Sequence, residues 1–275
     1  MIAPQELEIL LVVIQEQYGY DFTQYSRASL QRRIDHFCTT HKLKNFNDFL
    51  QLLQNPEYFT QLINELTVNV TEMFRDANFY NTLRKSVLPV LATYPFIRIW
   101  HAGCSTGEEV YSLAILLKEA GILHKSLLYA TDINPLVIEQ AKNGIFPARM
   151  MQLYSENYQL GGGKADFSDY YISNYNVAKF HESLKERMVF STHNLVSDKS
   201  FNVFQLVLCR NVLIYFDKDL QNRVLQLFDK SLDNLGFLGL GNKESIRFSA
   251  IAFKYLPINT TEKIWRKNTR FQRLS

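Results

Sequence analysis

Cysteine is scarce in this sequence, and its few cysteines are poorly placed for a disulfide or a metal site. Cys38, Cys104 and Cys209 lie far apart in the 275-residue chain and form no C-x-x-C pair. Zinc sites and disulfide frameworks need cysteines, or cysteines and histidines, at short and regular spacings. The sequence therefore predicts no metal site and no disulfide framework, and the odd number of cysteines fits a reducing compartment.

Long apolar runs are also missing. The run Ile9–Ile14 near the N-terminus is short and follows Glu6 and Glu8. A secretory signal peptide instead has basic residues in front of a longer apolar stretch. No run approaches the ~20 apolar residues that a membrane-spanning helix needs. We therefore expect a soluble, cytoplasmic protein without membrane insertion.

The chain has no large excess of charge of one sign. The net charge is +3, which is too small to predict binding to nucleic acid, and we expect no such partner. Basic residues do gather around a predicted helix at 29–41, where Arg27, Arg32 and Arg33 occur and the side chains of the last two are expected to point mostly outward. Such a group is by default a solvated helix face, and the alternative is a surface that docks an acidic partner.

The apolar pattern divides the chain into a helical part and an α/β part. Within residues 1–72, apolar residues recur at helical spacing in four segments, and a linker helix over 73–90 follows. From 91 to 275, short runs rich in β-formers alternate with helical patterns, which is typical of a parallel sheet covered by helices. The looser stretch 147–188, rich in tyrosine and glycine, predicts a small inserted β-lobe.

The stretch 96–109, FIRIWHAGCSTGEE, reads as a strand, a loop of small residues and the start of a helix. This is the opening unit of a nucleotide-binding α/β sheet. No lysine follows Gly107, and the loop lacks G-x-G-x-x-G, so neither a phosphate loop nor a dinucleotide site is predicted. Glu108 and Glu109 would repel a pyrophosphate but favour a cationic nucleoside such as S-adenosylmethionine. The alternative is that both acids only complement the helix dipole.

Polar residues follow other predicted elements of the chain. Asp132 ends the strand predicted at 126–130, where an acid can accept hydrogen bonds from ribose hydroxyls. A helix over 135–143, ended by Gly144, is predicted to follow. Arg75, in a segment that also holds Asn69 and Thr71, could bind a carboxylate through two parallel hydrogen bonds, or it could be a surface arginine beside a capped helix. The sheet is predicted to resume at 189–195, 204–209 and 210–216. A helix at 219–234, a strand at 237–241 and a closing antiparallel pair follow.

Five motifs, in order along essentially the whole chain, resemble those of the CheR-type chemotaxis receptor methyltransferases. They are TVNVTEMFRD (67–76), AGCSTGEEVYS (102–112), ATDIN (130–134), HNL (193–195) and CRNVLIYF (209–216). The resemblance implies a Rossmann-like S-adenosylmethionine-dependent methyltransferase domain, an all-helical N-terminal domain and a small inserted β-lobe. It also implies an enzyme that converts glutamate side chains of a chemoreceptor to methyl esters and leaves S-adenosylhomocysteine.

The resemblance also implies functional residues. Arg75 and Tyr215 would act near the transferred methyl group, Asp132 would bind the ribose, and Asn194 and Leu195 would contact the adenine. The implied cofactor contacts are Asn69, Thr71, Arg75, Gly103, Glu109, Asp132, Asn194, Leu195, Arg210 and Asn211. A glutamate carboxylate is already ionised at neutral pH, so we expect positioning residues and no Cys or His nucleophile, and we interpret His101 and His193 as structural.

The sequence departs from the family pattern in ways that leave the acceptor open. Val110 replaces a frequent proline, the segment 241–245 reads GNKES, and the lobe has its own sequence around 161–163. The expected partner is a methyl-accepting chemotaxis receptor or a related signalling protein. The alternatives are a methyltransferase with another acceptor, a non-catalytic regulatory module that binds S-adenosylmethionine or nothing and, more remotely, an NAD oxidoreductase.

Overall fold

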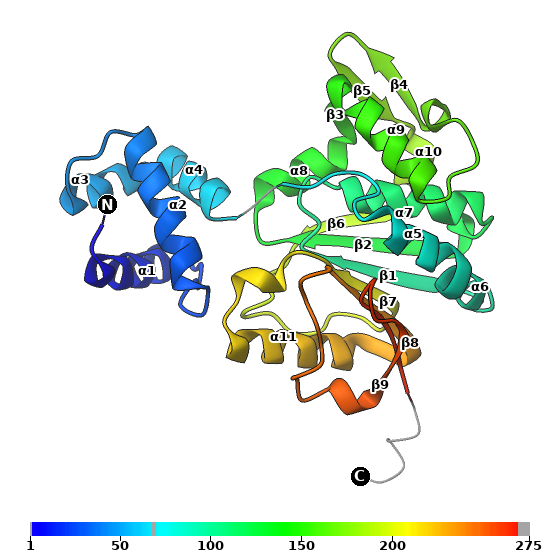
Figure 1. Cartoon of the computed structure of the whole chain (residues 1–275). Coiled ribbons are helices and arrows are strands. Elements are labelled where there is room, and N and C mark those ends of the chain that lie inside the picture. The colour runs from blue at the N-terminus through cyan, green and yellow to red at the C-terminus, as the bar shows by residue number, and fades with distance from the viewer. Residues whose placement is uncertain (1, 68–69, 269–275) are drawn as a thin grey trace. The chain divides into compact units, whose positions relative to one another are not determined.

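The computed structural model describes residues 2–67 and 70–268 (Figure 1). The chain forms two compact units, which we describe separately. Residues 1–69 and 213–224 make up the helical unit, and residues 70–212 and 225–275 make up the sheet unit. The predicted Asn69 lies outside the described residues.

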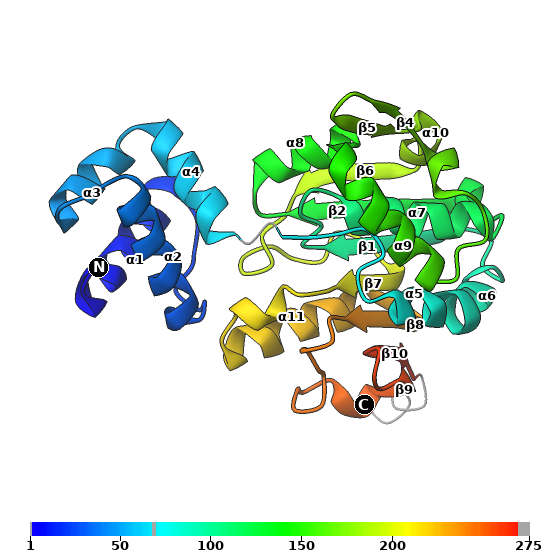
Figure 2. The ribbon, with the colours of Figure 1, turned by 45° about the horizontal axis from the view of Figure 1, so that its top comes forward.

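The helical unit contains the helices that the apolar pattern predicts (Figure 2). They are α1 (Pro4–Tyr18), α2 (Arg27–Thr40), α3 (Phe46–Leu53) and α4 (Pro56–Leu66). Gly19 ends α1 in the left-handed conformation, with a φ of 76°. The side chains of Asn45 and Asn55 accept hydrogen bonds from backbone N–H groups at the starts of α3 and α4, which satisfies donors that a helix leaves unpaired. The inward faces form one core that includes Leu10, Ile34 and Phe49.

The sheet unit is organised around a mixed sheet with the strand order β6-β2-β1-β7-β8-β10-β9. Its parallel strands are β1 (Ile97–Ala102), β2 (Ser126–Asp132), β6 (Met188–Thr192), β7 (Phe204–Cys209) and β8 (Leu232–Leu240). The strands β9 (Tyr255–Asn259) and β10 (Ile264–Lys267) close the sheet as the predicted antiparallel pair. The carboxyl ends of parallel strands share one edge of a sheet, where ligands bind in open α/β folds.

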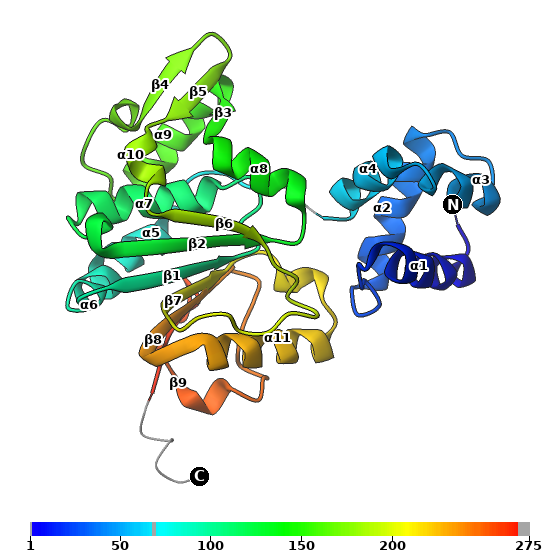
Figure 3. The ribbon, with the colours of Figure 1, turned by 180° about the vertical axis from the view of Figure 1, so that it is seen from behind.

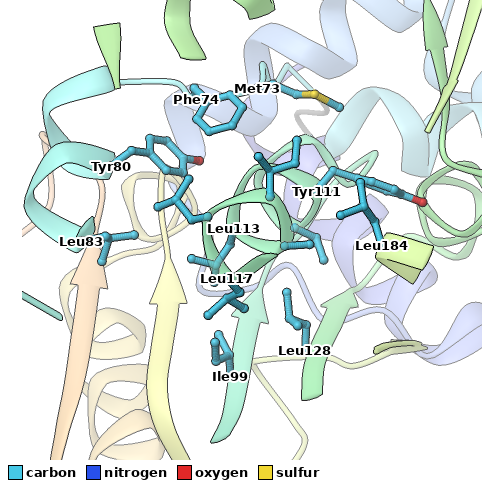
Figure 4. Packing of buried hydrophobic residues seen from close by; sticks show 14 of the residues in the cluster. Met73, Phe74, Tyr80, Leu83, Ile99, Tyr111, Leu113, Leu117, Leu128 and Leu184 are labelled. Carbon is cyan, nitrogen blue, oxygen red and sulfur yellow. The ribbon is translucent and has the colours of Figure 1, made fainter. Parts of the chain in front are cut away.

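Strand β1 is buried on both faces, which explains why apolar residues occupy most of its positions. Ile99 packs in the same core as Leu113 and Leu117 of α7 (Glu108–Glu119), as Figure 4 shows. On the opposite face, the Trp100 ring lies 5.4 Å from the ring of Phe228 in α11 (Lys218–Ser231). Parallel strands covered by helices on both faces have this near-continuous hydrophobicity.

Further helices precede and follow these strands. The stretch 73–90 contains α5 (Ala77–Thr82), a π-helical turn (Leu83–Val87) and the start of α6 (Leu88–Leu91). The helix α8 (Pro135–Asn143) has the predicted bounds, because the Asn134 side chain caps its start and Gly144 ends it at a φ of 65°. Within the described residues, no helix is both long enough and apolar enough to cross a membrane.

The inserted lobe is a small antiparallel sheet with helices (Figure 3). Its strands are β3 (Ile145–Pro147), β4 (Tyr171–Asn174) and β5 (Val177–Phe180), in the order β3-β5-β4, and α10 (Glu182–Lys185) follows. The lobe also contains α9 (Met151–Leu160), which its loose pattern did not predict. This helix is stabilised by tertiary packing, since Tyr158 is fully buried and its ring lies 5.2 Å from that of Phe74.

The expected strand at 210–216 is wrong. Strand β7 ends at Cys209, and a 3-10 helix occupies Leu213–Tyr215. Asn211 breaks the strand with a φ of 62°. The Glu244 carboxylate stabilises this turn by accepting hydrogen bonds from the backbone N–H groups of Asn211 and Val212, at 3.0 and 2.9 Å. The helix predicted at 219–234 is also too long, because its last three residues already belong to β8.

Candidate cofactor site

A tight turn follows β1 at the carboxyl edge of the sheet. Gly103 has a φ of +83°, and its N–H donates a 2.8 Å hydrogen bond to the carbonyl oxygen of Thr131 at the end of β2. A Cβ atom at Gly103 would lie only 2.4 Å from Cγ2 of Val212. The glycine is therefore required both by the backbone conformation and by the close approach of the segment that follows β7.

Glu109, in the first turn of α7, belongs to a buried charged cluster. Its carboxylate contacts Nδ1 of His101 at 2.9 Å and accepts a hydrogen bond from Nη1 of Arg210 at 3.3 Å. Burial alone would raise the pKa of Glu109, but the hydrogen bond and charge of His101, together with Arg210, lower it below its usual value. The structure thus pairs two residues, Glu109 and Arg210, that the sequence predicted as separate cofactor contacts.

Arg210 joins this cluster to the segment that precedes α5. Its Nη2 donates to Oδ2 of Asp76 at 2.7 Å and to the backbone oxygen of Arg75 at 2.9 Å. The guanidinium carbon also lies 4.1 Å from the centre of the Phe79 ring, a cation–π contact. Burial would lower the pKa of Arg210, but the negative groups around it raise the pKa above its usual value. Arg210 therefore remains charged and fixes three segments of the site.

Asp132 lies at the carboxyl end of β2, where the sequence placed it. Its two carboxylate oxygens accept hydrogen bonds from the backbone N–H groups of Ser105 and Asn134, at 2.9 and 3.1 Å. Burial raises the pKa of Asp132, against the lowering effect of these N–H donors. The carboxylate is thereby held in one orientation beside the turn after β1.

Glu108 and Glu109 are neighbours in the sequence but have different surroundings. Glu108 is 6% exposed and accepts a 2.6 Å hydrogen bond from the Thr106 hydroxyl, with Tyr154 of the lobe at 3.5 Å. Burial raises the pKa of Glu108, whereas that of Glu109 is lowered. Of the two glutamates expected to favour a cationic ligand, only Glu109 has surroundings that stabilise its negative charge. Glu108 instead packs between α7 and the lobe.

The segment before α5 contains two of the predicted cofactor contacts, Thr71 and Arg75. Thr71 is half-buried. The guanidinium of Arg75 makes a long contact of 3.4 Å with the backbone oxygen of Val70, and its own backbone oxygen binds Arg210. Arg75 is therefore tied to the charged cluster through its main chain, while its side chain extends from the same segment.

The other predicted contacts follow β6 and β7. Asn194 forms a turn in which its N–H donates to Asp198 at 2.8 Å and its side-chain oxygen accepts from the N–H of Val196 at 2.9 Å. Leu195, inside this turn, is half-buried. Asn211 occupies the left-handed turn after β7 and is also half-buried. Each of these residues follows a strand of the same parallel sheet.

Tyr215 belongs to the other compact unit, with residues 1–69. Its backbone oxygen accepts a 2.8 Å hydrogen bond from the N–H of Ser26, and the guanidinium carbon of Arg33 lies 5.2 Å from the centre of its ring. The outward orientation expected for Arg33 is therefore wrong: its side chain is half-buried, and it packs on Tyr215.

Sequence reasoning missed two acids that organise the site. Asp76 shares Arg210 with Glu109, and Glu244 accepts hydrogen bonds from the N–H groups of Asn211, Val212 and Gly241. Asp76 is the last residue of the motif TVNVTEMFRD, so its position in the sequence was a usable signal. Nothing in the local pattern around Glu244 distinguishes it from a surface acid.

The charges at this edge of the sheet fit a cationic nucleoside. Glu109, Asp76 and Asp132 supply three carboxylates to this edge, and Arg210 pairs with two of them, Glu109 and Asp76. The hydroxyl oxygen of Ser105, beside Asp132, is buried and has no hydrogen-bond partner within the described part of the chain. An acidic excess and an unused hydroxyl suit a ligand that carries a positive charge and hydroxyl groups better than a pyrophosphate.

Comparisons with known proteins agree with this chemistry. Residues 5–67 match the family model of the CheR methyltransferase all-alpha domain, and residues 69–262 match that of the CheR methyltransferase SAM binding domain. The chain is 46% identical over 269 residues to "Putative methyltransferase Cher3" of Pseudomonas putida, with 96% of this chain and 97% of the relative covered. It is 32% identical to a chemotaxis protein methyltransferase of Listeria monocytogenes, over 85% of this chain and 87% of the relative.

Solved structures of low sequence identity also match the chain. One is the N-methyltransferase NodS from Bradyrhizobium japonicum in complex with S-adenosyl-L-homocysteine, with 15% identity, 62% of each chain covered and a TM-score of 0.35. This likeness is too low to bear on function, so the assignment rests on the family models and the sequence relatives.

Proposed function

This chain belongs to the CheR methyltransferase family and uses S-adenosylmethionine, and on that basis we propose that it methylates glutamate side chains of a chemoreceptor or a related signalling protein. The relatives named chemotaxis protein methyltransferase support this class of acceptor. We further propose that the reaction takes place in the cytoplasm, since the receptor segments that such an enzyme modifies must be accessible to it.

The chemistry asks for alignment more than for activation. When bound, S-adenosylmethionine supplies a methyl group on a positively charged sulfur, which an ionised carboxylate can accept directly to give an ester and S-adenosylhomocysteine. A free glutamate side chain, with a pKa near 4.3, is ionised at neutral pH without a general base. Fixing the two reactants in line can remove several kcal/mol from such a barrier. The residues of the chain would therefore act by binding and orienting.

The observation that supports the cofactor contacts in this proposal is the acidic cluster at the sheet edge. Glu109 is kept ionised by His101 and Arg210, and Asp132 is held by two backbone N–H groups. We assign the ribose hydroxyls to Asp132 and the compensation of the positive charge to Glu109. Asn194 and Leu195, after β6, would contact the adenine. Asn211, Thr71 and Gly103 would complete the walls of the site, together with Asn69.

Arg75 and Tyr215 are the residues that we place at the reacting centre. Arg75 would bind the carboxylate of the methionine moiety through its guanidinium, which suits bidentate recognition. Its segment is anchored to the charged cluster by the hydrogen bond from Arg210 to its backbone oxygen. Tyr215 would lie by the transferred methyl group. Arg75→Ala should reduce methyl transfer at least ~tenfold while the fold is retained.

The basic surface near α2 is the proposed docking site for the acceptor protein. Its three arginines are not equivalent. Arg27 pairs with both carboxylate oxygens of Glu8, at 2.5 and 2.9 Å, and Arg33 packs on Tyr215. The Arg32 side chain is exposed. We therefore assign most of the attraction for an acidic acceptor surface to Arg32.

Methyl transfer from S-adenosylmethionine labelled in its methyl group tests the proposal. The acceptor is the cytoplasmic domain of a chemoreceptor from the same cell, and mild base is applied after the reaction. Label released as methanol marks an ester and supports the proposal. Base-stable label would instead show another acceptor chemistry. Binding of S-adenosylmethionine without any transfer would favour the regulatory module.

A further inference from the structure

We infer that Arg33 is a positioning residue that holds Tyr215 in place for methyl transfer, and that it does not dock the acceptor protein. This inference rests on the proposed function, which places Tyr215 beside the transferred methyl group. The two residues belong to the same compact unit, although Arg33 lies in the N-terminal helices and Tyr215 follows strand β7 in the sequence. Figure 2 shows α2, which carries Arg33.

The contacts of the Arg33 side chain all point into the protein. Its Nη1 donates to the backbone oxygen of Glu65 at 3.0 Å, and its Nε donates to the hydroxyl of Ser29 at 3.3 Å. The guanidinium carbon lies 5.2 Å from the centre of the Tyr215 ring. Burial lowers the pKa of Arg33 below its usual value, and the contact with the Tyr215 side chain offsets part of this effect. Because Glu65, Ser29 and Tyr215 already contact this side chain, it is poorly placed to bind an acceptor protein as well.

The backbone around Tyr215 is fixed independently by the loop that precedes α2. Ser26 donates its N–H to the Tyr215 oxygen at 2.8 Å, and the N–H of Asp217 donates to the oxygen of Gln24 at 2.9 Å. Between them, Tyr25 and Phe216 form a β-bridge, and their rings meet edge to face at 4.9 Å. The loop thus sets the course of the chain through 215–217, and Arg33 adds the constraint on the ring itself.

Because the loop before α2 fixes the backbone and Arg33 fixes the ring of Tyr215, the effect of losing Arg33 can be predicted. The backbone contacts would keep the segment in place, but the phenol ring would gain rotational freedom. A misaligned ring of this kind lowers kcat, the rate of methyl transfer in the bound complex, and leaves the affinity for either substrate unchanged. A docking arginine has the opposite signature, because its loss raises KM for the acceptor and leaves kcat unchanged.

Arg33→Gln and Arg32→Gln are a matched pair that separates the two roles. The residues are adjacent in α2 and have the same charge, but Arg32 is exposed. We expect Arg33→Gln to lower kcat about tenfold with little change in acceptor KM or in the affinity for S-adenosylmethionine, and Arg32→Gln to raise KM alone. Arg33→Lys, which keeps the charge but loses the planar group, should give an intermediate kcat and guards against misfolding of the first variant.

A double mutant shows whether Arg33 acts through Tyr215. Tyr215→Phe should lower kcat, and adding Arg33→Gln to it should lower kcat no further, because holding the ring has no effect on transfer once the hydroxyl that it positions is gone. An acceptor KM that rises in Arg33→Gln and Arg33→Lys at constant kcat would overturn the inference, as would fully additive losses in the double mutant. Full activity of Tyr215→Phe would overturn the proposed role of Tyr215 itself. A loss in Tyr215→Phe with none in Arg33→Gln would refute only the present inference.

Discussion

Replacing Glu109 by glutamine tests whether the charged cluster is the structural centre of the site. The change removes a carboxylate that contacts His101 at 2.9 Å and Arg210 at 3.3 Å, both of them buried. Breaking a buried ion pair from one side costs about 3–5 kcal/mol. Arg210 keeps Asp76 at 2.7 Å, so we expect a smaller loss, of about 2–3 kcal/mol in the free energy of unfolding, in line with charge-assisted hydrogen bonds.

Glu108→Gln is the matched control, one residue away in the same helical turn. Its folded-state pKa is raised by burial, so the charged form is disfavoured in the fold and stability falls as pH rises through that pKa. The pKa of Glu109 is lowered, so its contribution is present above the usual value of 4.5 and is lost as pH falls through the folded-state pKa. At pH 7, Glu108→Gln should therefore change stability little or raise it.

Urea unfolding followed by tryptophan fluorescence measures both variants. Trp100 is fully buried in β1 beside His101 and reports on this part of the fold. The deficit of Glu109→Gln relative to the unmodified protein should be largest near pH 7 and should shrink below about pH 4.5. Equal stability losses in the two variants at pH 7, or a deficit for Glu109→Gln that does not depend on pH, would refute the reasoning.

Three further changes test other parts of the site. Glu244→Gln should destabilise the protein by about 1–3 kcal/mol in urea unfolding, because a carboxylate that accepts three backbone N–H groups is replaced by an amide that offers donors of its own; an unchanged midpoint would contradict this. Gly103→Ala should lower stability and cofactor affinity together, and Val212→Ala should restore only part of the loss, since the φ of +83° remains strained; complete restoration would show that crowding alone matters. Asp132→Asn should weaken binding of S-adenosylmethionine at least ~tenfold in calorimetry without loss of the fold, because an amide is a poorer partner for ribose hydroxyls; unchanged affinity would remove Asp132 from the site.

Much of the fold could be predicted because local signals and packing agree. The helix α8 begins at an asparagine cap with a proline in the first turn and ends at a glycine, and the prediction had the same bounds. Strand β7 is buried along its whole length and ends before Arg210, so its mostly apolar run marked it correctly.

The predictions of secondary structure failed where tertiary interactions determine the local conformation. Residues 210–216 carry the apolar pattern of a strand, but the distant Glu244 stabilises a turn at Asn211 instead. The buried stripe of α9 consists of Met151, Tyr154 and Tyr158, and it is fixed by aromatic packing, for example of Tyr158 on Phe74. Neither contact can be inferred from the pattern of apolar and polar residues in the local sequence.

For the site, sequence indicated the residues but not their partners. Glu109, Arg210 and Asp132 follow strands or begin a helix at one edge, as their motifs suggested. That Glu109 and Arg210 bind each other, with Asp76 as a third member, depends on the strand order β1-β7 and was not readable from spacing. The local sequence around Arg33 is that of an exposed helical arginine, and its contacts with Tyr215, Ser29 and Glu65 distinguish it from Arg32.

Direct mapping of the methylated side chain tests the central claim most sharply. The protein is incubated with S-adenosylmethionine and a chemoreceptor cytoplasmic domain, and the modified receptor peptides are sequenced by mass spectrometry before and after mild base. We predict one added methyl group on glutamate side chains, lost on base treatment and absent when those glutamates are replaced by alanine. A methyl group on nitrogen, or on any residue other than glutamate, would contradict the assignment of this chain as a protein-glutamate methyltransferase.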